Sequence, residues 1–300
     1  MTGAHASSYR VTGIALALAG VIAFSFRPVL IKLAYAYVVD PVTLIALRMI
    51  FSLPFFLIAA WLTRGAGAAI APRDWLAVAF LGFLGYYASS FLDFLGLQYI
   101  AAGLGRLLLF IYPTIVVVLS ALFLKKPVTR REVAALFITY LGLFLVLAHA
   151  FGAKHENVPL GAALVFASAA LYAIYLVVGS QVVARVGSVR FTAYAMTIAS
   201  ACVITQFLAL RPLSALDLPP QVYGLSIAMA LGSTVLPVFM TSEALRRIGA
   251  NHVAIIGAVG PVTTIFFGWI GLEETMTALQ FAGALLVLVG VILVSLKPGA

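Results

Sequence analysis

The residues of this sequence that could do chemistry are a few polar side chains set inside long apolar runs. Between residues 74 and 97, Tyr86, Ser89, Ser90 and Asp93 recur at spacings of three and four, which places them on one stripe of a helix. A phenol, two hydroxyls and a carboxylate on one face could bind an ammonium group and other polar parts of a small solute. Because an ionisable group is costly among apolar residues, Asp93 indicates a cavity, an ion pair or both.

A second stripe lies within 158–183, where Ser168, Tyr172, Tyr175 and Gly179 fall at i, i+4, i+7 and i+11. Tyrosine faces on such a stripe could line a cavity or pack in a core, and the residues alone leave both readings open. Polar stripes turn away from lipid, so we expect both runs to border an interior.

Arginines also lie within the apolar runs. Arg27 lies deep in the first run and could bind a carboxylate. Arg106 and Asp93 lie about equally far from the turn between their runs, so they could form a structural ion pair or meet a solute, and both readings stay open. Arg48 lies nearer the end of its run, where we expect snorkelling to the interface or local pairing.

Motifs of membrane-embedded enzymes are absent from the sequence. It holds no HExxH, GxSxG or GxGD motif and no GxxxxGK[ST] phosphate loop. Its four histidines are dispersed without ligand spacing: His5, His149, His155 and His252. The single cysteine, Cys202, cannot form an intramolecular disulfide. We therefore expect no enzyme activity, no cofactor and no metal site.

The composition indicates what kind of structural element contains these residues. Hydrophobic residues make up 64% of the 300, charged residues 9%, and the mean hydropathy is +1.16, whereas a soluble domain carries roughly 25% charged residues. The chain therefore belongs in a lipid bilayer. The net charge of +9 does not indicate nucleic acid, because the basic residues cluster in short gaps between apolar runs. Ten runs are long enough to span a membrane: 11–36, 41–63, 74–97, 101–124, 132–151, 158–183, 189–210, 220–245, 250–272 and 277–296.

Lysine and arginine predict the orientation of these spans. With the N-terminus inside, twelve basic residues fall in the inner segments, whereas the outer segments hold only Lys154 and Arg211. We therefore expect a multi-pass protein with both termini in the cytoplasm.

The two halves of the chain repeat one another at a constant offset of 148 residues. Pro113 falls on Pro261, and the basic turn at Lys125 falls on an acidic turn at Glu273. Each half holds five runs, an odd number, so the second half enters the membrane from the opposite side. The positive-inside rule then explains why the turn reverses its charge.

We therefore predict an all-α integral membrane protein whose ten transmembrane helices form two five-helix inverted-topology repeats. The first repeat covers 11–151 and the second 158–296, within a single membrane domain. Inverted repeats are the usual architecture of secondary transporters, and their solute sites lie near the midplane beside interrupted helices.

The repeat extends the set of candidate residues, because Tyr86 corresponds to Thr234 and Asp93 to Thr241. The candidate substrate-binding residues are Phe24, Arg27, Tyr86, Ser90, Asp93, Arg106, Tyr112, Tyr172, Tyr175, Thr234 and Thr241. The candidate hinge positions, where proline or glycine interrupts a helix, are Pro28, Pro113, Pro237, Gly257, Gly260 and Pro261.

Three stretches carry a family resemblance that covers essentially the whole chain. They are "IALRMIFSLPFF", "GLQYIAAGLGRLLLFIYPTIVVVLSALFLKKPVTRREVAALFITYLGLFLVL" and "GANHVAIIGAVGPVTTIFFGWIGLEETMTALQFAGALLVLVGVILV". The sequence resembles the EamA repeat of the drug/metabolite transporter superfamily, and within it the bacterial amino-acid exporters, including aromatic ones. Two departures are the pair Lys125-Lys126 in the first turn and the unusual charge of Arg27 beside Pro28.

The resemblance implies a secondary transporter of the bacterial inner (plasma) membrane that exports small metabolites by alternating access, with neutral and aromatic amino acids as the expected substrates. The open alternatives are an exporter of drugs or nucleotide-linked sugars, a channel, and a non-transport membrane scaffold. The expected partners are the small-molecule substrate and the lipid bilayer, and no oligomer is required. We favour facilitated diffusion over proton antiport, which the resemblance keeps open.

Overall fold

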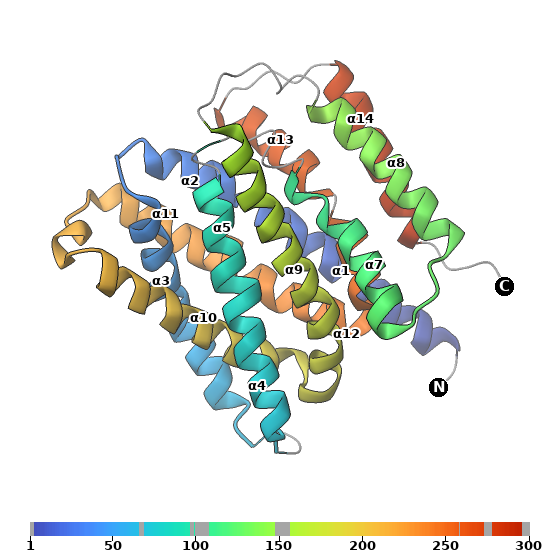
Figure 1. Ribbon diagram of the computed structural model, residues 1–300, viewed down its shortest axis with the longest axis horizontal. Coiled ribbons are helices and arrows are strands. Elements are labelled where there is room, and N and C mark those ends of the chain that lie inside the picture. Colours follow the sequence, from blue (N-terminus) through green and yellow to red (C-terminus); the bar gives the residue numbers. More distant parts are fainter. Residues whose placement is uncertain are drawn as a thin grey trace.

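The computed structural model describes residues 3–65, 69–96, 99, 108–147, 157–257, 259–272 and 278–295, and every regular element within them is a helix (Figure 1). The main elements are α1 (Gly3–Ser25), α2 (Arg27–Tyr35), α3 (Pro41–Leu62), α4 (Pro72–Leu81), α5 (Ser89–Gly96), α7 (Tyr112–Leu124), α8 (Arg130–Leu147), α9 (Val158–Val186), α10 (Ser188–Leu210), α11 (Pro220–Ala230), α12 (Leu236–Gly257), α13 (Val259–Leu272) and α14 (Ala278–Ser295). The all-α prediction is confirmed.

Within the described residues, six helical segments are long and apolar enough to cross a membrane: Ser8–Tyr35, Pro41–Leu62, Pro72–Gly96, Pro159–Val186, Ser188–Leu210 and Pro220–Gly257. The last holds one complete span and the start of another that continues in α13, because Gly249 has a φ of 77° and redirects the chain inside α12. The helices α7, α8 and α14 are shorter and equally apolar. Together the described residues form the ten transmembrane helices that the sequence predicts.

The sequence predicts the first span as one helix over 11–36, and the structure differs from this prediction. It begins at Gly3 and is interrupted at Phe26, between α1 and α2. Pro28 follows the interruption, and proline removes a backbone N–H and clashes with the carbonyl one turn earlier. The interruption therefore has a local cause in the sequence.

Two spans contain a π-helical segment, Gly82–Ala88 between α4 and α5 and Leu231–Val235 between α11 and α12. Residues 83–87 shifted by the repeat offset of 148 become 231–235, so the same irregularity recurs at the same place in each half. Such insertions widen a helix locally and are frequent at functional sites. The repeat therefore includes local helix geometry as well as sequence.

The most extensive packing joins one half of the chain to the other. The helix α1 packs along α12 and α5 along α9, while α3 packs on α10 and α8 on α14 (Figure 1). Under the repeat, the α1 span corresponds to α9 and the α4–α5 span to the α11–α12 span. The first two pairs are thus equivalent, as expected of inverted repeats.

The contact between α8 and α14 shows the pseudo-symmetry at atomic detail. A Cβ atom on Gly142 would lie 2.6 Å from the carbonyl oxygen of Gly283, and a Cβ atom on Gly290 would lie 2.9 Å from that of Ala135. Both pairs of positions, 142 with 290 and 135 with 283, differ by 148 residues. The two helices therefore cross with their backbones in direct contact at both glycines.

Polar contacts between the two halves join helix ends that the sequence predicts to lie on the same side of the membrane. On the side that carries most basic residues, Arg185 Nη2 lies 2.7 Å from Asp74 Oδ1. On the opposite side, Arg211 Nε lies 3.1 Å from Asp40 Oδ1. Below, the two faces of the molecule are called the basic face and the opposite face.

Asp40 also caps α3, where its carboxylate accepts hydrogen bonds from the backbone N–H of Val42 at 3.0 Å and of Thr43 at 3.3 Å. Burial alone would raise the pKa of this carboxyl group. The hydrogen bonds from Thr43 and Arg211 outweigh burial and hold the pKa below its ordinary value of 3.8. The connection between the first two spans is thereby fixed to the end of α10.

Candidate functional site

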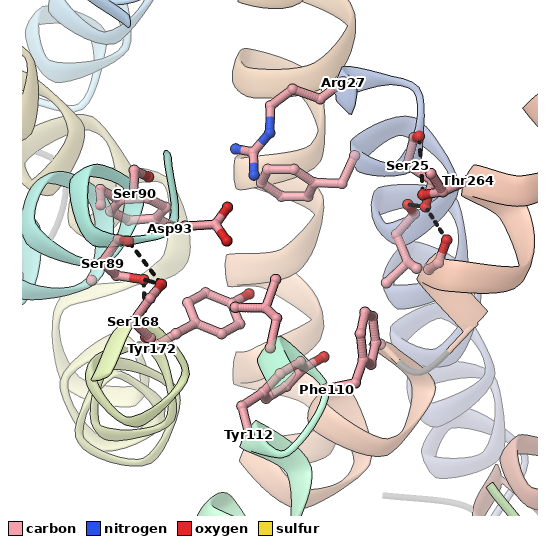
Figure 2. Close-up of a pocket in the computed structure, with 17 residues that line it drawn as sticks. Ser25, Arg27, Ser89, Ser90, Asp93, Phe110, Tyr112, Ser168, Tyr172 and Thr264 are labelled. Carbon is pink, nitrogen blue, oxygen red and sulfur yellow. Dashed lines mark hydrogen bonds between the residues drawn. The ribbon is translucent and has the colours of Figure 1, made fainter. Parts of the chain in front are cut away.

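A cavity of about 150 Å³ lies between the two halves of the chain. Its walls come from α1, α2, α5 and α7 of the first half and from α9, α12 and α13 of the second (Figure 2). The interruption at Phe26 and the π-helical segment Gly82–Ala88 both border it. Interrupted helices therefore meet at this cavity, which is the arrangement expected around a transporter's solute site.

Most of the candidate substrate-binding residues meet in this cavity. Those that line it are Phe24, Arg27, Tyr86, Ser90, Asp93, Tyr112 and Tyr172. Gly257 and Gly260 of the candidate hinge set line it too. Their shared location supports the group, while their role in binding stays a prediction.

Tyr175, Thr234 and Thr241 of the candidate set do not line the cavity. Tyr175 lies behind Tyr86, and Arg106 lies outside the described residues. Thr234 is buried and donates its hydroxyl proton to a backbone carbonyl of α11, and Thr241 is buried where α12 packs on α1. The repeat relates the backbones of the two halves, but the cavity draws on different helix faces in each half.

The candidate hinge prolines all lie near helix interruptions. Pro113 occupies the first turn of α7, Pro237 follows the π-helical segment at the start of α12, Pro28 lies in α2 and Pro261 in α13. Their role as hinges stays a prediction.

One side of the cavity carries opposite charges. Arg27 from α2 and Asp93 from α5 both extend into the central space (Figure 2). The Arg27 guanidinium carbon lies 5.4 Å from the centre of the Phe24 ring, a cation–π distance. A cation and a carboxylate in one cavity can bind the two ends of a zwitterion. In the described part of the chain, no three His, Cys, Asp or Glu residues form a metal-binding group.

The other side carries a hydroxyl cluster that the sequence analysis missed. At the end of α1, Ser25 Oγ lies 3.0 Å from the carbonyl oxygen of Gly260, and Thr263 donates to Ser25 Oγ at 2.6 Å. Thr264 donates to the carbonyl oxygen of Ser25 at 3.2 Å. The last carbonyls of a helix lack partners within it, so α13 supplies them here. Pro28 was the available signal, because it predicts a helix end just before it.

Four tyrosines form one wall of the cavity and the layer behind it. The hydroxyls of Tyr86 and Tyr175 lie 2.5 Å apart. The Tyr172 ring lies 5.2 Å from that of Tyr112, edge to face, and 5.8 Å from that of Tyr175. This tyrosine layer, defined by these four residues, joins α7, α9 and the π-helical segment.

The tyrosine layer closes the cavity toward the basic face. Behind it, Tyr175 stacks on Phe191 with ring centres 6.1 Å apart. Nearer that face, Ser188 donates to Glu243, whose carboxylate also lies 2.6 Å from Arg247 Nε. Aromatic packing and then an ionic cluster therefore separate the cavity from the basic face at the start of α10 and at Glu243 of α12.

Gly257 is a glycine because Tyr112 occupies the space of its missing side chain. A Cβ atom on Gly257 would overlap the Tyr112 hydroxyl, which donates to the carbonyl oxygen of Ala254 at 3.2 Å. A Cβ atom on Gly260 would lie 3.1 Å from the Phe110 ring. These glycines let two aromatic rings of the first half approach the helix of the second half closely.

Known proteins share both the sequence pattern and the fold. The profile of the EamA-like transporter family matches the chain twice, at residues 11–148 and 159–296. The uncharacterized transporter YcbK of Bacillus subtilis is 29% identical over 278 residues, 90% of this chain and 88% of its own. The pseudopaline exporter CntI of Pseudomonas aeruginosa is 26% identical over 296 residues, 95% of this chain and 96% of its own. A crystal structure with 18% identity has a TM-score of 0.79 and covers 95% of this chain and 98% of that one. With both halves matched, the chain belongs to the EamA-like transporter family.

Proposed function

We propose that this membrane transporter exports small amphoteric metabolites, first of all amino acids with neutral or aromatic side chains, across the bacterial inner membrane by alternating access. The observation that carries the proposal is the presence of Arg27 and Asp93 in one cavity, which aromatic rings and hydroxyl groups also line. A chain with this site acts as a carrier rather than as an enzyme.

The cavity suggests a binding mode for such a solute. The carboxylate binds Arg27, because a guanidinium matches carboxylate geometry. The ammonium group binds Asp93 or the oxygens around Ser25, and the side chain lies against the rings of Phe24 and Tyr172. Each end of the solute thus meets a group of complementary charge, and its apolar part meets an apolar wall.

The size of the cavity favours small solutes over the alternatives. Its volume of about 150 Å³ is that of a protein cavity that holds a benzene ring, roughly 150 Å³. Drug-sized ligands occupy pockets of roughly 300–1,000 Å³. Nucleotide-linked sugars and large drugs would require a much wider state of the carrier.

The closed basic face supports a two-state carrier. If the positive-inside rule sets the orientation, the basic face is cytoplasmic and the tyrosine layer separates the cavity from the cytoplasm. Loading from the cytoplasm then requires the contacts at Tyr175, Glu243 and Asp74 to open. We favour facilitated diffusion, because an accumulated metabolite needs no coupled ion to leave the cell.

The first test is uptake of labelled phenylalanine, methionine, threonine and glutamate into sealed proteoliposomes, with a nucleotide sugar for comparison and empty liposomes as the blank. We expect saturable, cross-competing amino-acid uptake. Because a hydrogen bond to a charged group contributes about 1.5–3 kcal/mol, Arg27→Gln and Asp93→Asn should weaken half-saturation about tenfold or more.

The control variant is Arg211→Gln, which removes a partly exposed cation outside the cavity and should leave uptake unchanged. Uptake of the nucleotide sugar alone would discard the amino-acid substrate and keep the carrier. No saturable flux of any solute would refute the proposed function.

A further inference from the structure

Arg48 of α3 is a buried cation that the proposed binding mode does not use. Its exposed fraction is 2%, and its Nε atom has no hydrogen-bond partner among the described residues. Its guanidinium carbon lies 5.9 Å from the centre of the Phe94 ring, the residue next to Asp93. Of the two expectations for Arg48, snorkelling and local pairing, snorkelling is wrong, because the side chain stays inside the protein beside the cavity wall.

Arg48 belongs to a charge cluster with Arg27 and Asp93. The three groups interact electrostatically with one another, and Arg27 and Asp93 are the charged residues of the cavity lining within the described chain. Two guanidinium groups and one carboxylate sum to a charge of +1. We call these three residues the charge cluster.

The second half of the chain does not balance this excess. At the repeat offset, Arg27 corresponds to Tyr175 and Arg48 to Met196, both fully buried. Asp74 and Asp40, on the two faces, already have cationic partners in Arg185 and Arg211. Among the described residues that line the cavity, Asp93 is the one carboxylate.

An uncompensated charge in the interior of a membrane protein is unfavourable. A bound solute with a net charge of −1 would neutralise the charge cluster, whereas a zwitterion would leave the excess in place. A cationic solute would increase it. Among solutes of similar shape, we therefore expect the site to bind those with a net charge of −1 most tightly, zwitterions less tightly and cations least tightly.

We propose that the charge cluster makes this carrier prefer amphoteric solutes with one carboxylate more than they have amines, and that the membrane potential drives their export. The inference rests on the proposed function and changes its order of substrates: among amino acids of similar shape, those with an acidic side chain come before neutral ones. Amino acids with an acidic side chain are the simplest members of the class.

The driving force follows from the charge that moves in each cycle. The loaded cluster is neutral when it carries the anion outward, and the empty cluster returns with a charge of +1. One negative charge therefore leaves per cycle, and an inside-negative potential favours both the return step and the whole cycle. At equilibrium each 100 mV supports a concentration ratio of about 50-fold. A zwitterion gains nothing from the potential.

Two isosteric pairs of amino acids test the charge preference, glutamate with glutamine and aspartate with asparagine. Proteoliposomes are loaded with one labelled member, and valinomycin with a potassium gradient sets the potential. We expect glutamate to compete for the site about tenfold better than glutamine, and an inside-negative potential to accelerate glutamate efflux but not glutamine efflux. The result does not depend on the orientation of the protein in the vesicle.

Variants of Arg48 assign the preference to the charge cluster. In Arg48→Met, which introduces the residue that the second half has at the equivalent buried position, glutamate should lose its advantage over glutamine in competition for the site. Its efflux should still respond to the potential, because the solute itself carries the net negative charge. Arg48→Lys keeps the positive charge and should keep the advantage of glutamate. Arg211→Gln removes a cation far from the cavity wall and should change neither the advantage nor the response to the potential.

The outcomes separate this inference from the proposed function. If glutamate and glutamine are transported equally well and without an effect of potential, the carrier stands and the charge preference is wrong. If Arg48→Met keeps the preference, or Arg48→Lys loses it while folded, the charge cluster is not its source. If no amino acid is transported, the proposed function fails and this inference fails with it.

Discussion

Asp40 offers a pH test at the level of a single residue. Its pKa is depressed below 3.8 in the folded protein by the hydrogen bonds from Thr43 and Arg211, which outweigh burial. A depressed pKa stabilises the fold above the unfolded pKa of 3.8, and this stabilisation is lost as the pH falls through the folded value. The side chains of Asp40 and Arg211 are 33% and 39% exposed, so the ion pair contributes under about 1 kcal/mol.

We therefore expect Arg211→Gln to lower the free energy of unfolding by less than about 1 kcal/mol at pH 7. The difference should persist down to about pH 4 and vanish below it, because protonated Asp40 no longer attracts the arginine. Thermal unfolding of both proteins in detergent, measured across this range, checks it. A difference that grows in acid would contradict the assignment.

Part of the site could be predicted from the sequence, because some of its residues are polar or charged where the surrounding run is apolar. Arg27 and Asp93 are charges in apolar runs, and Tyr172 lies on a polar stripe, so their approach to one cavity could be predicted. For the Ser25 cluster, Pro28 indicated only the helix end, and the partners of Ser25 could not be predicted because they lie 235 residues or more away. Snorkelling of Arg48 was wrong, because the distance of a residue from the helix end says nothing about which neighbours cover its side chain.

At the level of helices, the crossing of α8 and α14 depends on its glycines. A Cβ atom on Gly142 would lie 2.6 Å from the Gly283 carbonyl oxygen and 2.8 Å from the backbone nitrogen of Val287. Because these neighbours are backbone atoms, the helices must move apart. We expect Gly142→Ala to destabilise the protein by about 1–3 kcal/mol, the usual effect of overpacking.

A matched control comes from Gly224 of α11, where an added Cβ atom would meet nothing within 4 Å. Gly224→Ala should be neutral or stabilise by up to about 1 kcal/mol, because alanine favours the helix. Unfolding midpoints of both variants in the same detergent make the comparison. Equal effects of the two substitutions would show that the crossing tolerates separation.

Helix irregularities were predictable only where proline causes them. Pro28 accounts for the interruption of the first span, and Pro237 follows the π-helical segment Leu231–Val235. The equivalent segment Gly82–Ala88 has no proline beside it. Its geometry was therefore not predicted from the local sequence, although both halves share it.

At the level of the whole molecule, hydropathy and charge predicted the ten spans and their inverted repeat, because the bilayer imposes both on the sequence. The structure places the connections on two faces, and the positive-inside rule assigns the basic face to the cytoplasm. Val128 lies on that face between α7 and α8, and Leu213 lies on the opposite face after α10. Both side chains are exposed.

Cysteine labelling tests this orientation. In a Cys202→Ser background, Val128→Cys should react with a membrane-impermeant maleimide only after the cells are opened, whereas Leu213→Cys should react in intact cells. Labelling of Val128→Cys in intact cells, with Leu213→Cys protected, would invert the assigned topology. The parent Cys202→Ser protein, without a new cysteine, measures background labelling.

The packing of each half against the other also determines when the helices can assemble during biosynthesis. The partner of α8 is α14, which follows it by 148 residues, so at a synthesis rate of about 5–20 residues per second the ribosome completes it roughly 7–30 s later. Until then the glycine-lined face of α8 lies against lipid or the insertion machinery. Assembly of this transporter therefore waits for the synthesis of α14, and a nascent chain released after its first five helices would lack the partners that hold each of them in place.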